Sequence, residues 1–187
     1  MEPINTDVID ELIKVSRVNS PELPPERFLD LIRYAPVADE RNTWSGISDV
    51  NEHFRAKVSE TLYLDFTSRD ISLIRFIVEQ DTLSRSSYAG GDIVLSSYML
   101  FSLGNVEDVF RLFKAKSSGG MDTWIAMDPY LLFGAGIEET QRYLQDVDNE
   151  ESQQILSFIE EDFLPSYDPD LDRYRKGMEQ YYAPLRK

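Results

Sequence analysis

The sequence predicts an all-α fold in which helical hairpins stack into a short array, with further helices on either side. Apolar residues recur mainly at spacings of three and four, the period of a helix with one buried face, and strict alternation over the length of a strand is hard to find. We expect a single helical domain over residues 1–187, with N-terminal helices and a loop (1–47), hairpin repeats (48–147) and C-terminal helices (148–187).

The N-terminal segment carries the boundary signals of two helices. Asn5 or Thr6 can cap the first helix, because side-chain oxygens at this position accept from the free N–H groups of the first turn. Pro24 and Pro25 suit the start of a second helix, which Pro36 would end. One face of the first helix would be shared by Val8, Ile9, Leu12, Ile13 and Ser16.

A loop is expected over residues 37–46, followed by a long helix capped by Ser48. The apolar residues of this helix fall four apart, so that they share one face. They are Val50, Phe54, Val58, Leu62 and Phe66.

From Tyr63 onward the chain resembles itself at intervals of roughly 32 to 35 residues, the length of one helix–turn–helix unit. The equivalent positions are Tyr63, Tyr98 and Tyr130; Phe66, Phe101 and Phe133; and Gly104 and Gly136. A unit of this length cannot bury its apolar face alone and must pack on neighbouring units. We therefore expect three stacked helical hairpins.

Boundary residues support this division. Asp70 would cap a helix from Ile71 to Gln80, and Asn105 would cap a helix with Lys116 near its negative end. Gly104 and Gly136 are expected at turns that need a positive φ. The remaining helices would start at Asp128 with Pro129, span residues 150–163, and run from Pro169 to Tyr182 with Asp168 as the N-cap.

The stretch from Gly104 to Phe113 resembles the second helix of an ankyrin repeat, and the stretch from Gly136 to Leu144 is similar to it. The Thr-Pro-Leu-His opening of the ankyrin first helix is absent, and residues 127–131 come nearest to it. The resemblance implies a stacked interaction scaffold without catalytic chemistry. Other helical repeats of similar length remain open.

Composition excludes several functional classes. The chain of 187 residues has a formal net charge of −15 and no cysteine. Strong negative charge disfavours nucleic acids and anionic membranes as partners, since nucleic-acid affinity comes largely from Lys and Arg. The lack of cysteine excludes disulfides and thiolate metal sites. No basic leader and no apolar run of about eighteen residues is present, so we expect a cytoplasmic protein.

Most of the negative charge lies between residues 137 and 172. This segment holds twelve acidic side chains and one basic one, Arg142, for a net charge of −11. The acids are Glu138, Glu139, Asp146, Asp148, Glu150, Glu151, Glu160, Glu161, Asp162, Asp168, Asp170 and Asp172. The segment can steer a basic partner by long-range attraction, or it can simply be a solvated face.

No set of residues points to a metal, a cofactor or a catalytic centre. Asp168, Asp170, Asp172 and Glu179 have the spacing of a calcium loop, but Arg173 occupies the position that requires glycine. These acids are better explained by a helix start. The lone histidine, His53, has no partner motif for nucleophilic catalysis, so we expect no catalytic, metal or cofactor residues.

The function that the sequence favours is a non-enzymatic protein-binding scaffold, most concretely an acidic inhibitor or immunity-type protein that masks a basic partner. Trp124 can anchor a partner, although its spacing to Met127 and Leu131 also suits a core residue. The predicted contact residues are Asp122, Trp124, Asp146, Asp148, Glu150 and Glu151. Two alternatives stay open: a carboxylate-based, Mg²⁺-dependent helical enzyme, and a self-associating assembly module.

Overall fold

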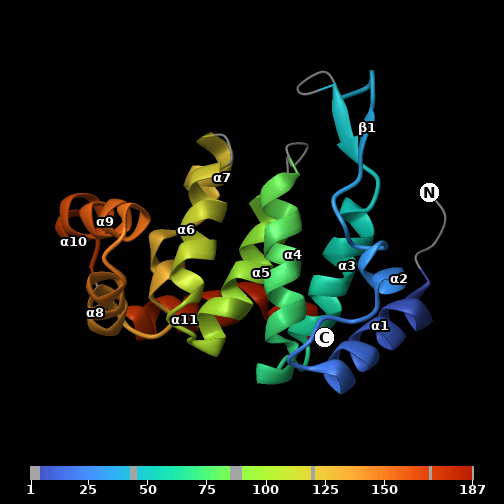
Figure 1. Cartoon of the computed structure of the whole chain (residues 1–187), viewed down its shortest axis with the longest axis horizontal. Coiled ribbons are helices and arrows are strands. Elements are labelled where there is room, and N and C mark those ends of the chain that lie inside the picture. Colours follow the sequence, from blue (N-terminus) through green and yellow to red (C-terminus); the bar gives the residue numbers. More distant parts are fainter. Residues whose placement is uncertain (1–4, 43–45, 85–89, 119–120, 169, 187) are drawn as a thin grey trace.

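The computed structural model describes residues 5–42, 46–84, 90–118, 121–168 and 170–186 (Figure 1). Helices make up most of these residues, which confirms the predicted dominance of α structure. The elements follow one another along the long axis of the molecule (Figure 1), and the final long helix runs back along it. None of the described helices is long and apolar enough to cross a membrane.

The first helix begins as predicted and the second is shorter than predicted. In α1 (Thr6–Asn19), Asn5 Oδ1 accepts a hydrogen bond from the Asp7 N–H at 3.0 Å. Helix α2 (Glu26–Leu29) ends well before Pro36, and the chain continues in turns. The reason lies in the tertiary structure, because the backbone of residues 32–35 bonds to side chains of later elements.

The structure departs from the expected loop at residues 37–46 at both ends of this segment, where two short strands form a hairpin. Strand β1 (Pro36–Ala38) pairs antiparallel with β2 (Ile47–Asp49). Ser48 therefore does not cap a helix: it lies opposite Val37 and donates to Asp39 Oδ2 at 2.9 Å. Helix α3 (Glu52–Tyr63) starts after this hairpin. Strands of three residues are too short to give a periodic signal.

The middle of the chain forms η1 (Ser68–Asp70), α4 (Ile71–Leu83), α5 (Gly90–Leu103) and α6 (Asp108–Ser118). Helix α3 packs against α4 and α5, and α4 packs against α5 and α6. Asp70 does not cap α4 with its side chain as predicted. Its fully buried carboxylate accepts instead from the Thr67 N–H at 2.8 Å and from Arg17 Nε at 2.8 Å.

The last third is built from short helices and one long one. In order they are α7 (Met121–Ala126), η2 (Pro129–Phe133), α8 (Ile137–Val147), α9 (Glu150–Ser157), the π-helical η3 (Phe158–Phe163), α10 (Leu164–Ser166), α11 (Leu171–Tyr182) and η4 (Ala183–Arg186). Asp128 caps η2 as predicted, with Pro129 at its first position. Helix α11 is capped by Asp170, not by Asp168, and Pro169 lies outside the described residues.

The positions paired by self-similarity have related but unequal surroundings. Gly104 and Gly136 both have left-handed backbone, with φ of 68° and 104°, as predicted for turns. The rings of Tyr63 and Tyr98 lie 6.3 Å apart, at the end of α3 and in α5. Tyr130, in contrast, lies on a 3₁₀ segment of five residues, so the third unit has no full first helix.

A buried arginine joins the N-terminal hairpin to the helices. The Arg55 side chain is fully buried, and its Nη2 donates to Asp49 Oδ2 at 2.8 Å while its Nε donates to Asp81 Oδ1 at 2.5 Å. Its Nη1 donates to the Ile32 carbonyl at 3.2 Å. Asp49 Oδ1 in turn accepts from the Ala35 N–H at 3.0 Å. One guanidinium thus fixes β2, α3, α4 and the segment before β1.

We expect Arg55→Met to destabilise the fold by about 3–5 kcal/mol, because it leaves two buried carboxylates without their cation. Urea unfolding followed by circular dichroism measures the loss. The control is Arg41→Met, since Arg41 pairs with Asp39 on the surface and its side chain is 92% exposed; this change should stay within about 0.5 kcal/mol. Equal unfolding midpoints for the two variants would contradict the role given to Arg55.

Gly134, directly after η2, lies close against the backbone of α5. A Cβ atom at this position would lie 2.4 Å from the Phe101 carbonyl oxygen and 2.9 Å from the Phe101 Cα. Both are backbone atoms, so the contact cannot be relieved by a change of side-chain rotamer. A residue without a side chain is therefore required here for α5 and η2 to meet.

We expect Gly134→Ala to lower the free energy of unfolding by about 1–3 kcal/mol, as overpacking does in other cores. Thermal unfolding of the two proteins measures the difference. A matched glycine is Gly177 in α11, where a Cβ would meet nothing within 4 Å; Gly177→Ala should raise helix stability by about 1 kcal/mol. A neutral Gly134→Ala variant would show that η2 can move away from α5.

Candidate functional site

The acidic segment forms one end of the molecule. Helices α8, α9 and α10 lie together at the end opposite α1 (Figure 1). All twelve acidic side chains between residues 137 and 172 are exposed. The structure therefore gathers these charges on a terminal unit, which we call the acidic end and define as residues 137–172.

Few of these charges are neutralised within the molecule. Glu139 pairs with Arg142 at 2.6 Å, and Asp168 pairs with Arg173 at 2.9 Å. The other ten acids of the acidic end form no ion pair within the part of the chain that the structure describes. They contrast with the acids of the body, where Asp49, Asp70, Asp81 and Asp108 are buried and each bonds to arginine.

Four of the predicted contact residues lie together at the turn between α8 and α9. Asp146 lies in the last turn of α8, and Asp148 ends this helix in left-handed backbone with φ of 43°. Glu150 and Glu151 occupy the first turn of α9, where the helix dipole favours acids. All four are exposed. Asp148 Oδ1 accepts from Gln153 Nε2 at 3.0 Å, which orders the turn.

The other two predicted contact residues lie on α7. Asp122 is exposed, and Trp124 is 39% exposed. The Trp124 ring packs edge-on against Phe158 of η3, with ring centroids 5.7 Å apart. The tryptophan is thus neither a free anchor nor a core residue, and Phe158 connects it to the acidic end.

Lys116 lies in the last turn of α6, near the helix end as predicted, but its burial was not predicted. Its side chain is 3% exposed, and its Nζ donates to the carbonyl oxygens of Trp124 and Met127, each at 2.6 Å. The ammonium also lies 4.3 Å from the centre of the Trp124 ring. Burial lowers the pKa of Lys116 and raises the pKa of the nearby Asp128. The Lys116 position at a helix end gave no signal that distant carbonyls would bind it.

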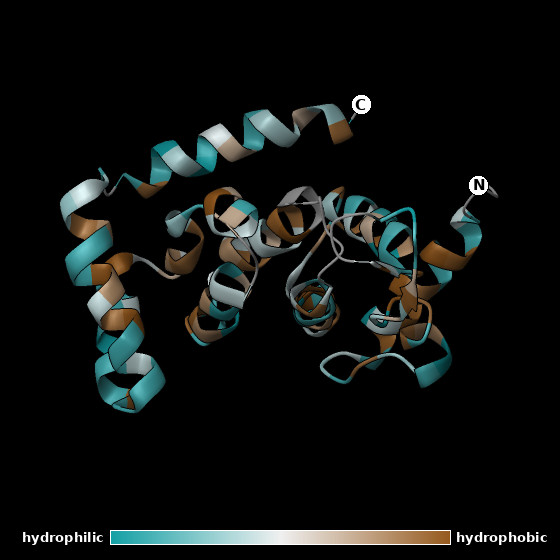
Figure 2. Ribbon diagram, turned by 90° about the horizontal axis from the view of Figure 1, so that it is seen from above, coloured by the Kyte–Doolittle hydropathy of each residue, from teal (hydrophilic) through white to brown (hydrophobic). Residues whose placement is uncertain are grey.

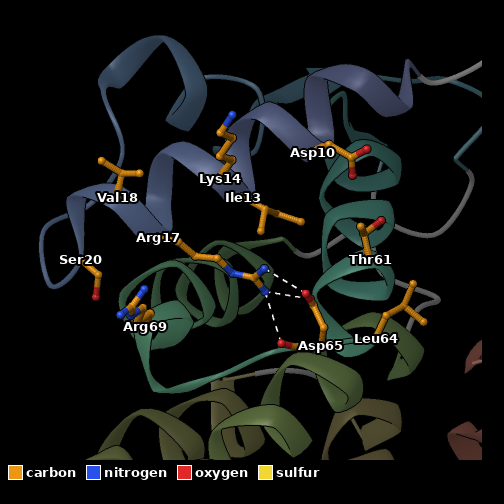
Figure 3. A pocket seen from close by; sticks show the side chains of 10 residues that line it. All are labelled: Asp10, Ile13, Lys14, Arg17, Val18, Ser20, Thr61, Leu64, Asp65 and Arg69. Carbon is orange, nitrogen blue, oxygen red and sulfur yellow. Dashed lines mark hydrogen bonds and ion pairs between the residues drawn. The ribbon is translucent and has the colours of Figure 1, made fainter.

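A second candidate region is an open groove between α1 and α3 that the sequence did not predict (Figure 3). Its volume is about 890 Å³. The groove is lined by Asp10, Ile13, Lys14, Arg17, Val18, Ser20, Thr61, Leu64, Asp65 and Arg69. Val18 and Leu64 are 79% and 51% exposed, which places apolar surface beside charges of both signs.

Arg17 is the central charge of this groove and is already neutralised (Figure 3). Its Nη2 and Nη1 donate to the Asp65 carboxylate at 2.8 and 3.0 Å, and its Nε donates to Asp70 Oδ1 at 2.8 Å. These hydrogen bonds lower the pKa of Asp65 and raise that of Arg17. The pairing closes α1 onto the end of α3 and onto η1, so Arg17 has a structural role.

The single histidine and the possible metal ligands can be located in the structure. His53, the single histidine, is exposed on α3 and does not line the groove. Within the described residues, no three carboxylates or imidazoles come together as a metal would require. Asp170 accepts instead from the Arg173 N–H at 2.9 Å as a helix cap.

Comparisons with known proteins add no relative. No family model, no curated protein and no solved structure matches the chain. The assignment of function therefore rests on the chain's own residues.

Acid titration should reveal the Arg17 pair. The pKa of Asp65 in the folded chain is below its ordinary value of 3.8, so its contribution to stability is complete above that pH and is lost as the pH falls through the folded-state pKa. We expect Asp65→Asn to lower the melting temperature at neutral pH and to match the wild type in strong acid. Asp10→Asn on the same groove is the control and should show no such convergence. A gap that persists in acid would contradict the assignment.

Proposed function

We propose that the chain is a non-enzymatic protein-binding scaffold whose acidic end masks a basic surface on a partner. One observation carries this proposal: the ten acids of the acidic end that are exposed and form no ion pair within the described chain. Elsewhere the same protein buries acids against arginines. Carboxylates without an ion pair repel one another and lower the stability of the compact chain. A basic surface on a partner protein, which would neutralise them, therefore explains them best.

The arrangement suits rapid capture of a basic protein. Opposite charge on two partners accelerates their encounter by roughly tenfold to a thousandfold at low salt. Affinity then depends on buried contacts, which Trp124 and Phe158 can supply beside the charges. An acidic inhibitor or immunity-type protein that covers a basic toxin or nuclease is the most concrete form of this function.

The scaffold itself is proposed to be a short array of stacked hairpins related to ankyrin-like repeats. Contacts of α3 with α5 and of α4 with α6 support it, since helices of adjacent hairpins meet in this order in stacked arrays. The left-handed Gly104 and Gly136 at equivalent turns give further support. Such arrays present a rigid surface and carry no chemistry of their own.

A charge-matched pair of variants tests the acidic end. The first variant changes Asp146 and Asp148 to Asn and Glu150 and Glu151 to Gln. The control neutralises four exposed acids of the body, namely Asp10, Glu11, Glu22 and Glu40. Immobilised wild-type chain is used to capture basic proteins at low salt, and association rates are then measured with each purified binder.

We expect the first variant to slow association by about tenfold or more at low salt, and the control to stay within about twofold. High salt should remove the difference, because it screens exposed charges. Equal slowing by both variants would mean that total charge alone matters. Association that ignores ionic strength would count against the proposed function.

A further inference from the structure

The repeated aromatic residues form a row along one side of the molecule, and α11 covers it. Tyr63 ends α3, Tyr98 and Phe101 belong to α5, and Tyr130 belongs to η2. Figure 2 shows α11 lying along one side of the molecule, parallel to its long axis. We call these four side chains the aromatic row.

The first half of α11 binds the row through one tyrosine and one arginine. Tyr174 stacks on Tyr130 with ring centroids 4.8 Å apart, and it meets the face of Phe101 edge-on at 5.5 Å. The Arg175 guanidinium lies 4.8 Å from the centre of the Phe101 ring. Aromatic stacking and cation–π contacts therefore hold this part of the helix.

The second half repeats the pattern two helical turns later. Tyr182 lies 5.7 Å from Tyr98 and 5.4 Å from Tyr63 between ring centroids. Arg186 follows in η4, with its guanidinium 4.8 Å from the centre of the Tyr63 ring. A helix that fits the row therefore carries aromatic side chains on one face and arginines beside them.

The fit between α11 and the row is incomplete. Of the residues in α11, only Tyr182 is buried. The hydroxyl groups of Tyr63 and Tyr174 are buried and have no hydrogen-bond partner among the described protein atoms. Buried polar groups without partners weaken an interface, so α11 is held less firmly than its ring contacts alone would suggest.

A hollow beside Gly177 shows that the packing of α11 is also incomplete in shape. It measures about 360 Å³, and Tyr130, Gly177, Met178 and Tyr181 contribute to its walls. A Cβ on Gly177 would meet nothing within 4 Å, so no neighbour requires glycine there. Glycine in a helix interior also weakens the helix. A helix with a larger residue at this place would cover more of the hollow, which borders the row at Tyr130.

We propose that the aromatic row is the docking groove for a basic amphipathic helix of a partner protein, and that α11 is a resident helix which this partner displaces. The partner helix carries aromatic or methionine side chains four residues apart, arginines beside them, and a residue larger than glycine opposite the hollow.

The charge of α11 and of the residues after it favours this occupant. Residues 173–187 hold five basic side chains and one acidic one, within a chain of net charge −15, so the helix that fits the groove is basic. The groove begins at Tyr130, whose ring also contacts Phe163 and Tyr167 of the acidic end. That the partner is basic rests on the proposed function, whereas the aromatic pattern rests on α11 itself.

Displacement requires that the partner overcome a local competitor. A tethered helix competes at an effective concentration in the millimolar range for a short linker. The apparent affinity of a partner therefore equals its intrinsic affinity multiplied by the fraction of molecules in which the groove is open. The unfilled hollow and the attraction of the acidic end are the two features that can offset this loss.

The test uses the full chain and a fluorescent peptide of residues 173–187 as the probe, with binding followed by anisotropy. Gly177→Ala in the protein stabilises the resident helix and should weaken peptide binding about fivefold, since an undocked helix of this length is mostly unfolded. Arg175→Ala in the protein loosens the resident helix and should strengthen peptide binding about twofold to fivefold. Lys176→Ala, on an exposed side chain, is the matched control and should change nothing.

Opposite responses of Gly177→Ala and Arg175→Ala support displacement, because both changes are made in the protein while the peptide keeps its wild-type sequence. A peptide with serine in place of Tyr174, Met178 and Tyr182 keeps the charge and should not bind. Three results would overturn the proposed docking groove. They are equal binding of the serine peptide, no peptide binding by any protein variant, and the same peptide affinity in all variants.

Two further outcomes separate the proposals. Peptide binding could be weakened by the acidic-end variant and left unchanged by the α11 variants. The peptide then binds the acidic end, which overturns the docking groove and leaves the proposed function standing. If only the α11 variants respond, the groove stands and the acidic end loses its role. A dimer formed by exchange of α11 at working concentration, seen by light scattering, would assign the groove to a second copy and overturn the separate partner.

Discussion

The buried guanidinium of Arg55 is the constraint on which the N-terminal half depends. Two carboxylates from different elements, Asp49 and Asp81, are buried with it, and burial of such charges is tolerated only when they are paired and hydrogen-bonded. Arg55 also binds the Ile32 carbonyl, in the segment where the chain leaves α2 and continues in turns. The β hairpin, α3 and α4 are thereby held in one relative position.

The same use of arginine explains how an acidic protein divides its charge. Asp108 is buried and bonds to Arg75 and Arg111, each at 2.7 Å, and Asp70 is bound by Arg17 in the same way. The buried acids of the body therefore act as internal links. The acidic end carries twelve acids and one base, so −11 of the net charge of −15 lies at one end of the molecule.

Local signals were predictable from the sequence, and distant partners were not. Asn5, Asp128 and the glycines at positions 104 and 136 act within a few residues of themselves, and each was predicted correctly. Ser48 was misplaced because its partner, Asp39, lies across a hairpin. Lys116 lies at its predicted helix end, but its bonds to the carbonyls of Trp124 and Met127 leave no trace in local spacing. For the acidic end, charge could be predicted; its separation from the body could not.

The aromatic row combines residues that recur along the sequence with a third segment, η2, that is shorter than α3 and α5. Tyrosine recurs at equivalent places in α3, α5 and η2, so a line of rings results wherever these elements lie side by side. The third unit cannot extend the pattern, because η2 is short and Gly134 draws it against α5. The chain then turns away into the acidic end and returns as α11, whose Tyr174 and Tyr182 match the row. In the proposed array, the repeated segments would supply the docking groove, and α11, which does not repeat, would supply its resident helix.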